Sequence, residues 1–204
     1  MNGEKFDLHR VIAHCRELGM RFGIWFEPEM VSYDSDLFRG HPEYVLRGGA
    51  DTAFVQRHQF HLDMSDPQVV TCVYRQMKAF LEEYPVDYIK WDYNRIVAEH
   101  DSPAHPGRQG EVYHRLVLGY YALIGRLTRE YPGIVFEGCA SGGGRFDLGT
   151  LYYCPQIWAS DNCEPAQRLS IQYNFSLGYP LACIGAHVNG GREEDFAAKS
   201  MLAL

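Results

Sequence analysis

The sequence predicts an α/β fold with a parallel sheet, because segments with strand character alternate with segments of helical periodicity. Short runs rich in β-branched and aromatic residues recur at 21–27, 86–92, 134–139, 156–161 and 179–185. Segments with apolar residues at helical spacing lie at 6–18, 67–83 and 111–130. The most apolar strands show little alternation of polar and apolar residues, as expected for strands buried on both faces.

Each predicted helix presents one apolar face. In the first helix this face comprises Val11, Ile12, Cys15 and Leu18. In the second helix it comprises Val69, Val70, Val73, Met77, Phe80 and Leu81. In the third helix it comprises Val112, Leu116, Tyr120, Leu123, Ile124 and Leu127. The segment 33–60 shows no periodicity, and we expect it to be a long excursion over one end of the domain.

Composition limits the classes of partner. With 204 residues, 46% of them hydrophobic, the chain can form one globular domain. Its formal charge is −7 and its Lys and Arg residues are scattered, which argues against nucleic acid or an anionic membrane as a partner. No apolar run approaches the roughly 18–20 residues that span a bilayer. The six cysteines lack CxxC spacing and predict free thiols, so we expect a cytoplasmic protein.

Polar residues cluster directly after the predicted strands. They are Glu27 and Glu29, then Asp92, Asn94 and Arg95, then Cys139 and Ser141, and finally Asp161 and Asn162. Polar groups at the ends of several strands favour a (β/α)8 TIM-type barrel over a doubly wound sheet. The glycine run 142–144 lacks the spacing of a phosphate-binding loop. Because a barrel closes with eight strands and only about five are evident, we expect residues 1–204 to form a partial barrel domain.

Asp92 is the first candidate for catalysis. On a strand, Lys90 and Asp92 point to the same face, and Asn94 joins them if the extended backbone continues. An ammonium beside a carboxylate favours the ionised form, which the nucleophile of a glycosidase requires. The residues alone equally allow a structural Lys–Asp pair.

Asp161 is the second candidate. It follows an apolar strand, and desolvation by Trp158 and Ala159 would raise its pKa and suit it to act as a general acid. From the residues alone, a helix N-cap at Asp161 or Asn162 is the better interpretation. Two carboxyl groups about 5–5.5 Å apart would permit retaining glycoside hydrolysis.

Two further pairs of polar residues have simpler interpretations. His58 and His61 have a spacing compatible with a metal, but no third ligand lies near them, so we predict no metal site. Glu27 and Glu29 flank Pro28, and this short separation favours buried hydrogen-bonding roles over a catalytic pair.

Five segments in this order resemble glycoside hydrolase family 36, the bacterial type of α-galactosidase. They are GIWFEPEMV (23–31), RHQFHLDMS (57–65), YIKWDYNR (88–95), FEGCASGGGRFD (136–147) and IWASDN (157–162). The resemblance implies a retaining hydrolase that removes terminal α-galactosyl residues from oligosaccharides of the melibiose and raffinose type. It implies that Asp92 attacks the anomeric carbon, and that Asp161 protonates the leaving oxygen and then activates water.

The resemblance also implies a set of substrate-binding residues. Arg57, Lys90 and Asn94 would bind sugar hydroxyls, and Trp25 would pack against the galactose. Cys139 and Gly142 would line the side near the 2-hydroxyl, where a glycine-rich loop lets the backbone approach a ligand. Trp91 and Tyr93 belong to the same motif as Asp92 and complete the predicted set.

The resemblance further implies that the chain is part of a longer protein. It would cover about strands 3 to 7 of the barrel, without the family's N-terminal β-sandwich, its paired-aspartate motif or its C-terminal sheet. The full protein would need no cofactor and would form a homo-oligomer. The alternatives are an α-N-acetylgalactosaminidase, a galactosyl transferase on the same scaffold, and a non-catalytic carbohydrate-binding fragment. The loop 139–145 would distinguish the α-N-acetylgalactosaminidase, because an N-acetyl group needs room beside the 2-position of the sugar.

Overall fold

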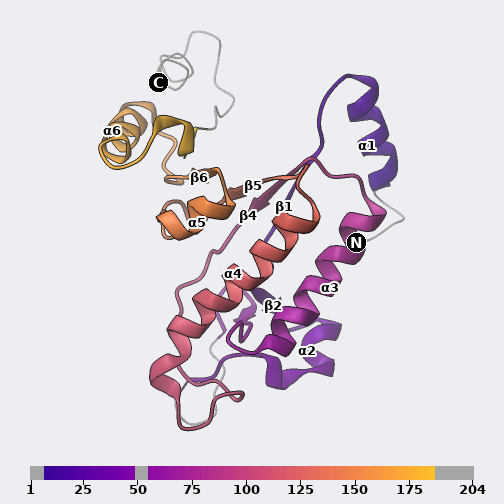
Figure 1. The fold of residues 1–204 in the computed structure, drawn as a ribbon, viewed down its shortest axis with the longest axis vertical. Helices are drawn as coiled ribbons and strands as arrows, with labels where there is room; N and C mark the ends of the chain where they lie inside the picture. The colour runs from indigo at the N-terminus through magenta and orange to yellow at the C-terminus, as the bar shows by residue number, and fades with distance from the viewer. Residues whose placement is uncertain (1–6, 49–54, 187–204) are drawn as a thin grey trace.

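The computed structural model describes residues 7–48 and 55–186, and a five-stranded sheet lies at its centre (Figure 1). Its strands, in spatial order, are β1 (Gly23–Phe26), β4 (Tyr88–Trp91), β5 (Val135–Gly138), β6 (Gln156–Trp158) and β7 (Ile184–Gly185). Each strand runs parallel to its neighbour. All five fall within the predicted runs, which confirms the α/β fold with a parallel sheet. Only the end of the run 179–185 is a strand, because Leu181–Cys183 form the 3₁₀ turn η4.

The register of the sheet aligns the carboxyl ends of its strands. Phe26 pairs with Trp91, and Trp91 pairs with Gly138. Gly138 pairs in turn with Ile157, whose neighbour Trp158 pairs with Gly185. The residues that follow β1, β4, β5 and β6 therefore meet at one edge of the sheet.

The predicted helices are present with nearly the expected bounds. They are α1 (Leu8–Glu17), α3 (Pro67–Glu83) and α4 (Val112–Glu130). Two further helices, α5 (Leu148–Tyr153) and α6 (Pro165–Ser176), follow β5 and β6. Asp7 and Asp66 cap α1 and α3, accepting hydrogen bonds from the backbone N–H groups of Arg10 and Gln68. The 3₁₀ turn η3 (Gln109–Glu111) leads into α4.

The core lies between the sheet and the helices α3 and α4, which run side by side (Figure 1). The sheet contributes Ile89, Trp91, Phe136 and Ile157, and the helices contribute Val69, Val73, Met77, Leu123, Ile124 and Leu127. Full burial of each aliphatic side chain contributes about 1.5–3 kcal/mol. This packing makes the sheet a rigid platform for the loops at its carboxyl edge.

The segment 33–60 contains regular structure that the sequence did not indicate. Ser35 caps the five-residue helix α2 (Asp36–Gly40), and the 3₁₀ turn η1 (Pro42–Tyr44) follows it. At its far end, β3 (Gln59–His61) pairs antiparallel with β2 (Met30–Ser32). These elements were not predicted from the sequence, because elements this short show no periodicity. Residues 49–54 of the segment lie outside the described residues.

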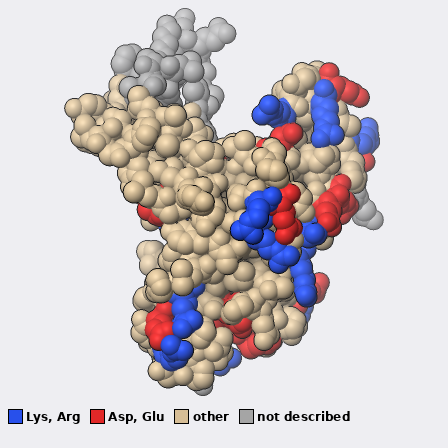
Figure 2. All heavy atoms as spheres, in the orientation of Figure 1, with Lys and Arg blue, Asp and Glu red and all other residues tan. Residues whose placement is uncertain are grey.

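The surface carries mixed charge. On the face shown in Figure 2, basic and acidic side chains lie next to one another, and neither sign forms a continuous patch. The six cysteines are free thiols. Among the described residues, no helix has the length and apolar character that crossing a bilayer requires.

Candidate active site

An open hollow of about 480 Å³ lies at the carboxyl edge of the sheet. It is lined by Arg57, Lys90, Asp92, Asn94, Cys139, Ser141 and Asp161. Both predicted catalytic aspartates and four of the predicted substrate-binding residues thus lie around one space. Ser141 lines the hollow as well, although its sequence position, after a predicted strand, indicated no specific role.

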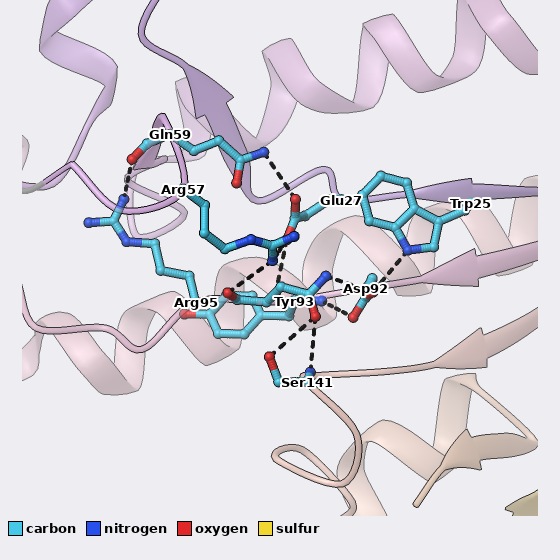
Figure 3. A network of polar contacts seen from close by, with 9 residues as sticks. Trp25, Glu27, Arg57, Gln59, Asp92, Tyr93, Arg95 and Ser141 are labelled. Carbon is cyan, nitrogen blue, oxygen red and sulfur yellow. Dashed lines mark hydrogen bonds and ion pairs between the residues drawn. The ribbon is translucent and has the colours of Figure 1, made fainter. Parts of the chain in front are cut away.

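Asp92 lies at the base of the hollow, directly after β4, and is 6% exposed. Its Oδ2 accepts hydrogen bonds from Trp25 Nε1 at 2.9 Å and from Asn94 Nδ2 at 2.7 Å. Its Oδ1 accepts a hydrogen bond from the backbone N–H of Tyr93 at 2.9 Å. Figure 3 shows the Trp25 ring, which comes from β1, approaching the carboxylate.

These donors decide the protonation state of Asp92. Burial by itself would raise the pKa of this carboxyl group. Hydrogen bonds from Trp25, Asn94, the Cys139 thiol and the Tyr93 amide outweigh burial and lower the pKa below its ordinary value. Asp92 is therefore a desolvated carboxylate that is ionised at neutral pH.

Lys90 is not the partner of Asp92 that the sequence suggested. Its Nζ lies 3.4 Å from Oε1 of Glu137, the residue opposite it on β5, and 4.9 Å from the centre of the Trp158 ring. The structural Lys–Asp pair therefore does not form, because the cross-strand carboxylate attracts the ammonium group. Hydrogen-bond donors, and not Lys90, therefore keep Asp92 ionised.

Cys139 follows β5 and serves as a donor to Asp92. Burial, together with the hydrogen bond to Asp92, raises the pKa of its thiol to about 12. The sulfur therefore keeps its proton at neutral pH and can donate it to the carboxylate.

Asn94 connects three loops at the hollow. Its Nδ2 donates to Asp92, and its Oδ1 accepts from the Ser141 backbone N–H at 3.2 Å and the Ser141 hydroxyl at 3.3 Å. Its own backbone N–H donates to Glu27 Oε1 at 3.0 Å. Ser141 has a φ of 48°, a left-handed conformation that non-glycine residues adopt at a cost of about 1–3 kcal/mol.

Asp161 lines the other side of the hollow. Its Oδ1 accepts a hydrogen bond from Trp158 Nε1 at 2.9 Å, and the residue is exposed. The expected desolvation by Trp158 and Ala159 is therefore wrong for this structure, since both are buried while the carboxyl group faces the open hollow. Nor does Asp161 cap α6, because Glu164 accepts the hydrogen bonds from the first N–H groups of that helix.

Gly142 does not line the hollow, but it lies where the loop after β5 contacts the loop that holds Asp161. Its φ is 82°, and a Cβ at this position would lie 2.8 Å from Ser160 Cα and 3.0 Å from the Asp161 backbone nitrogen. The loop after β5 can pack against the loop of Asp161 only because this residue has no side chain.

Trp91 and Tyr93 belong to a network behind the hollow. Trp91 is 0% exposed and donates from Nε1 to Glu29 Oε1 at 2.9 Å. The Tyr93 hydroxyl lies 2.6 Å from His61 Nε2, and the Arg145 guanidinium stacks 4.2 Å from the Tyr93 ring. The structure thus turns both side chains away from the hollow, and only the Tyr93 amide reaches Asp92.

The remaining acidic and histidine candidates have structural partners. Glu29 is buried and binds Arg145 through both oxygens, at 2.8 and 3.0 Å, which confirms its hydrogen-bonding role. His61 Nδ1 lies 2.7 Å from the Leu62 carbonyl oxygen, and burial lowers the pKa of His61 to about 4. The described part of the chain holds no group of three or more His, Cys, Asp or Glu residues placed to bind a metal ion. We assigned no role to Arg145, which follows the glycine run 142–144, because nothing in the sequence indicates that it pairs with Glu29.

The chain is similar to known proteins over almost its whole length. A family model described as Melibiase matches residues 2–203. Alpha-galactosidase 1 of Pediococcus pentosaceus is 46% identical over 203 residues, which cover 96% of this chain and 28% of the relative. The chain therefore spans little more than a quarter of the length of this curated relative.

Solved structures of alpha-galactosidases are also similar to this chain. The alpha-galactosidase from Lactobacillus brevis matches with a TM-score of 0.91 and 44% identity, over 100% of this chain and 28% of that one. A variant of the GH36 alpha-galactosidase AgaA from Geobacillus stearothermophilus, solved in complex with raffinose, matches with a TM-score of 0.90 and 39% identity. That match covers 98% of this chain and 29% of the AgaA chain.

Proposed function

The chain belongs to the melibiase family, and from this premise we propose that it is the catalytic segment of an α-galactosidase. The proposed reaction is hydrolysis of terminal α-linked galactose from oligosaccharides of the melibiose and raffinose type. The observation that carries the proposal is Asp92, a carboxylate kept ionised by four donors, in one hollow with a second carboxyl group, Asp161.

The proposed mechanism is a double displacement with retention of configuration. Asp92 attacks the anomeric carbon and forms a glycosyl ester, while Asp161 gives its proton to the departing glycosidic oxygen. Asp161 then takes a proton from a water molecule, which attacks the same carbon and releases Asp92 as the carboxylate. The low pKa of Asp92 supports its role as the nucleophile.

The other residues of the hollow support sugar binding. Arg57, Lys90 and Asn94 carry polar groups on its walls, where the hydroxyls of a bound galactose would lie. Trp25 is about half exposed beside Asp92 and offers a ring face for the sugar to pack against. Cys139 lines the side that we assign to the 2-hydroxyl, and Gly142, behind it, lets the loop after β5 pack against the loop of Asp161. Since Trp91 and Tyr93 point away from the hollow, we assign them a supporting role.

The full protein is proposed to be larger than this chain. The strand order β1-β4-β5-β6-β7 follows the chain order, which suits a segment of a (β/α)8 barrel, and we take these as about its strands 3 to 7. The rest of the barrel, an N-terminal β-sandwich and a C-terminal sheet would come from the remainder of the protein. We propose a cytoplasmic homo-oligomer that acts without metal or organic cofactor.

Replacement of Asp92 tests the proposed function. In the intact enzyme, we expect Asp92→Ala to lower kcat/KM for an aryl α-galactoside by about 1,000-fold or more, because the covalent route is lost. Asp66→Asn is a matched control, since asparagine caps α3 as well as aspartate does. Asp92→Ala activity within about tenfold of the wild type would remove Asp92 as the nucleophile.

The alternatives give different results in the same assay. A preference for the aryl α-N-acetylgalactosaminide over the aryl α-galactoside would identify an α-N-acetylgalactosaminidase. Formation of a new galactoside in the presence of an acceptor sugar, faster than hydrolysis, would identify a transferase. Galactose binding without turnover by the wild type would support a carbohydrate-binding role.

A further inference from the structure

Glu27 lies directly after β1 and its side chain is buried, at 4% exposed. Its Oε1 accepts hydrogen bonds from the Asn94 backbone N–H at 3.0 Å and from Arg57 Nη1 at 3.4 Å. Its Oε2 accepts from Gln59 Nε2 at 3.0 Å. Figure 3 shows the carboxylate of Glu27 between Arg57 and Gln59. Glu27 does not line the hollow itself.

The donors to Glu27 come from segments far apart in the sequence. Arg57 lies in the turn before β3, Gln59 is the first residue of β3, and Asn94 follows β4. The same Arg57 nitrogen also donates to the Asn94 carbonyl oxygen at 3.2 Å. Glu27, Arg57 and Asn94 therefore form a closed ring of contacts that fixes one wall of the hollow.

Arg57 occupies a conformation that needs such support. The backbone groups of Gln56 and Gln59 exchange two hydrogen bonds, at 3.1 and 3.0 Å, which closes a tight turn. The two central residues, Arg57 and His58, have φ values of 56° and 60°, as in the I′ turns that glycine and asparagine favour. Each such residue costs about 1–3 kcal/mol, so contacts outside the turn must hold Arg57 there. The carboxylate of Glu27 provides one such contact, an ion pair with the Arg57 guanidinium.

The ring reaches the nucleophile through Asn94. Glu27 holds the Asn94 backbone, and the Asn94 side chain donates to Asp92 Oδ2 at 2.7 Å. We propose that Glu27 is a positioning residue, which fixes Asn94 as a donor to Asp92 and Arg57 as a wall of the sugar site. The proposal rests on the proposed role of Asp92.

The role requires a carboxylate rather than an amide. Three donors converge on the two oxygens of Glu27, and one of them is a guanidinium. In Glu27→Gln, an NH₂ group would face a donor and Arg57 would lose its charged partner. The side-chain volume stays nearly the same, so the change tests hydrogen bonding and charge rather than packing.

The test uses Glu27→Gln in the intact enzyme, with an aryl α-galactoside as substrate. We expect kcat/KM to fall about 10- to 100-fold through loss of alignment. We also expect the acid limb of the pH profile to move to higher pH, because a loosened Asn94 stabilises ionised Asp92 less. Of the other ionisable groups that line the hollow, Lys90, Cys139 and Asp161 remain in place, whereas Arg57 loses its charged partner. A displaced Arg57 moves the limb in the same direction, because a cation near a carboxylate lowers its pKa.

Glu99→Gln is the matched control. Glu99 is as deeply buried and pairs with an arginine, but its hydrogen bonds go to Arg95 and the Ala98 backbone N–H rather than to Arg57 and Asn94. We expect this variant to lose stability and to keep the wild-type acid limb. If Glu27→Gln does not fold, Glu27→Asp replaces it, since the shorter side chain keeps the charge but cannot reach all three donors. The same upward shift is then expected.

The outcomes separate this proposal from the proposed function. A folded Glu27→Gln variant with kcat/KM within about twofold of the wild type and an unmoved acid limb would overturn the positioning role. In that case an inactive Asp92→Ala would still support the nucleophile. An Asp92→Ala variant as active as the wild type would instead overturn the proposed function, and the role of Glu27 with it.

Discussion

The protonation state of Asp92 depends on individual hydrogen-bond donors and not on a neighbouring cation. Trp25, Asn94, Cys139 and the Tyr93 amide all donate to this carboxylate, while Lys90 pairs with Glu137. Neutral donors lower the pKa without neutralising the charge of the carboxylate. They therefore leave Asp92 ionised yet available to react.

Trp25→Phe removes one of these donors and keeps an aromatic ring. The pKa of Asp92 is below its ordinary value in the folded enzyme, so losing the 2.9 Å hydrogen bond should raise it. We expect the acid limb of kcat/KM to move to higher pH, measured with an aryl α-galactoside. Tyr152→Phe, on an exposed ring of α5, is the control. An acid limb at wild-type pH in Trp25→Phe would contradict the importance of this donor.

His61 makes stability depend on pH. Its pKa falls to about 4 in the folded protein, from an ordinary value of 6.5, because burial disfavours the charged ring. The unfolded chain therefore binds the proton more readily, and stability that is complete above pH 6.5 is lost as the pH falls towards 4. This loss amounts to about 3 kcal/mol when complete.

His61→Gln should remove that pH dependence. Urea unfolding at pH 7.5 and pH 4.5 should show a smaller loss of unfolding free energy than in the wild type. His58→Gln, at an exposed position in the same motif, should keep the wild-type loss. Equal losses in all three proteins would show that His61 is not the responsible group.

At the scale of elements, α4 packs closely against the loop that follows β3. Gly119 allows this approach, because a Cβ there would lie 1.7 Å from the Met64 carbonyl oxygen. Met64 precedes α3, so the contact holds α3 and α4 in the arrangement that covers the sheet.

Gly119→Ala should therefore destabilise the protein by about 3 kcal/mol or more, since backbone must move to make room. Gly40→Ala, at the end of α2 where a Cβ meets nothing within 4 Å, should change stability by less than about 1 kcal/mol. Thermal unfolding of the two variants measures the difference. Similar melting temperatures would contradict the close contact.

Element prediction from the sequence succeeded where segments were long or strongly apolar. The helices α1, α3 and α4 follow from apolar residues at helical spacing, and the strands of the main sheet follow from short runs rich in β-branched and aromatic residues. The pair β2–β3 and the helix α2 did not, because three to five residues carry too little pattern. Along β4, side chains alternate between the two faces, so Trp91 points to the face opposite Lys90 and Asp92. This alternation could have removed Trp91 from the predicted substrate-binding residues, but the motif resemblance led us to include it.

At the scale of the whole molecule, the site is assembled from loops that follow different strands. Trp25 and Glu27 come from the end of β1, Asp92 from that of β4, and Ser141 from that of β5 (Figure 3). Asn94 follows β4 as well. The parallel register brings these loops to one edge, which is why strand-end position predicted most of the hollow. Hydrogen-bond partners such as Glu137 for Lys90 depend on cross-strand neighbours, which a single sequence does not specify.

The covalent intermediate on Asp92 is the most direct test of the proposed mechanism. The intact enzyme would be treated with an activated, fluorinated galactoside that glycosylates the nucleophile but hydrolyses slowly, and the labelled peptide would be sequenced by mass spectrometry. We predict a single galactosyl label on Asp92, absent from Asp92→Ala. A label on Asp161 or another residue, or product of inverted configuration with no labelled peptide, would contradict Asp92 as the nucleophile.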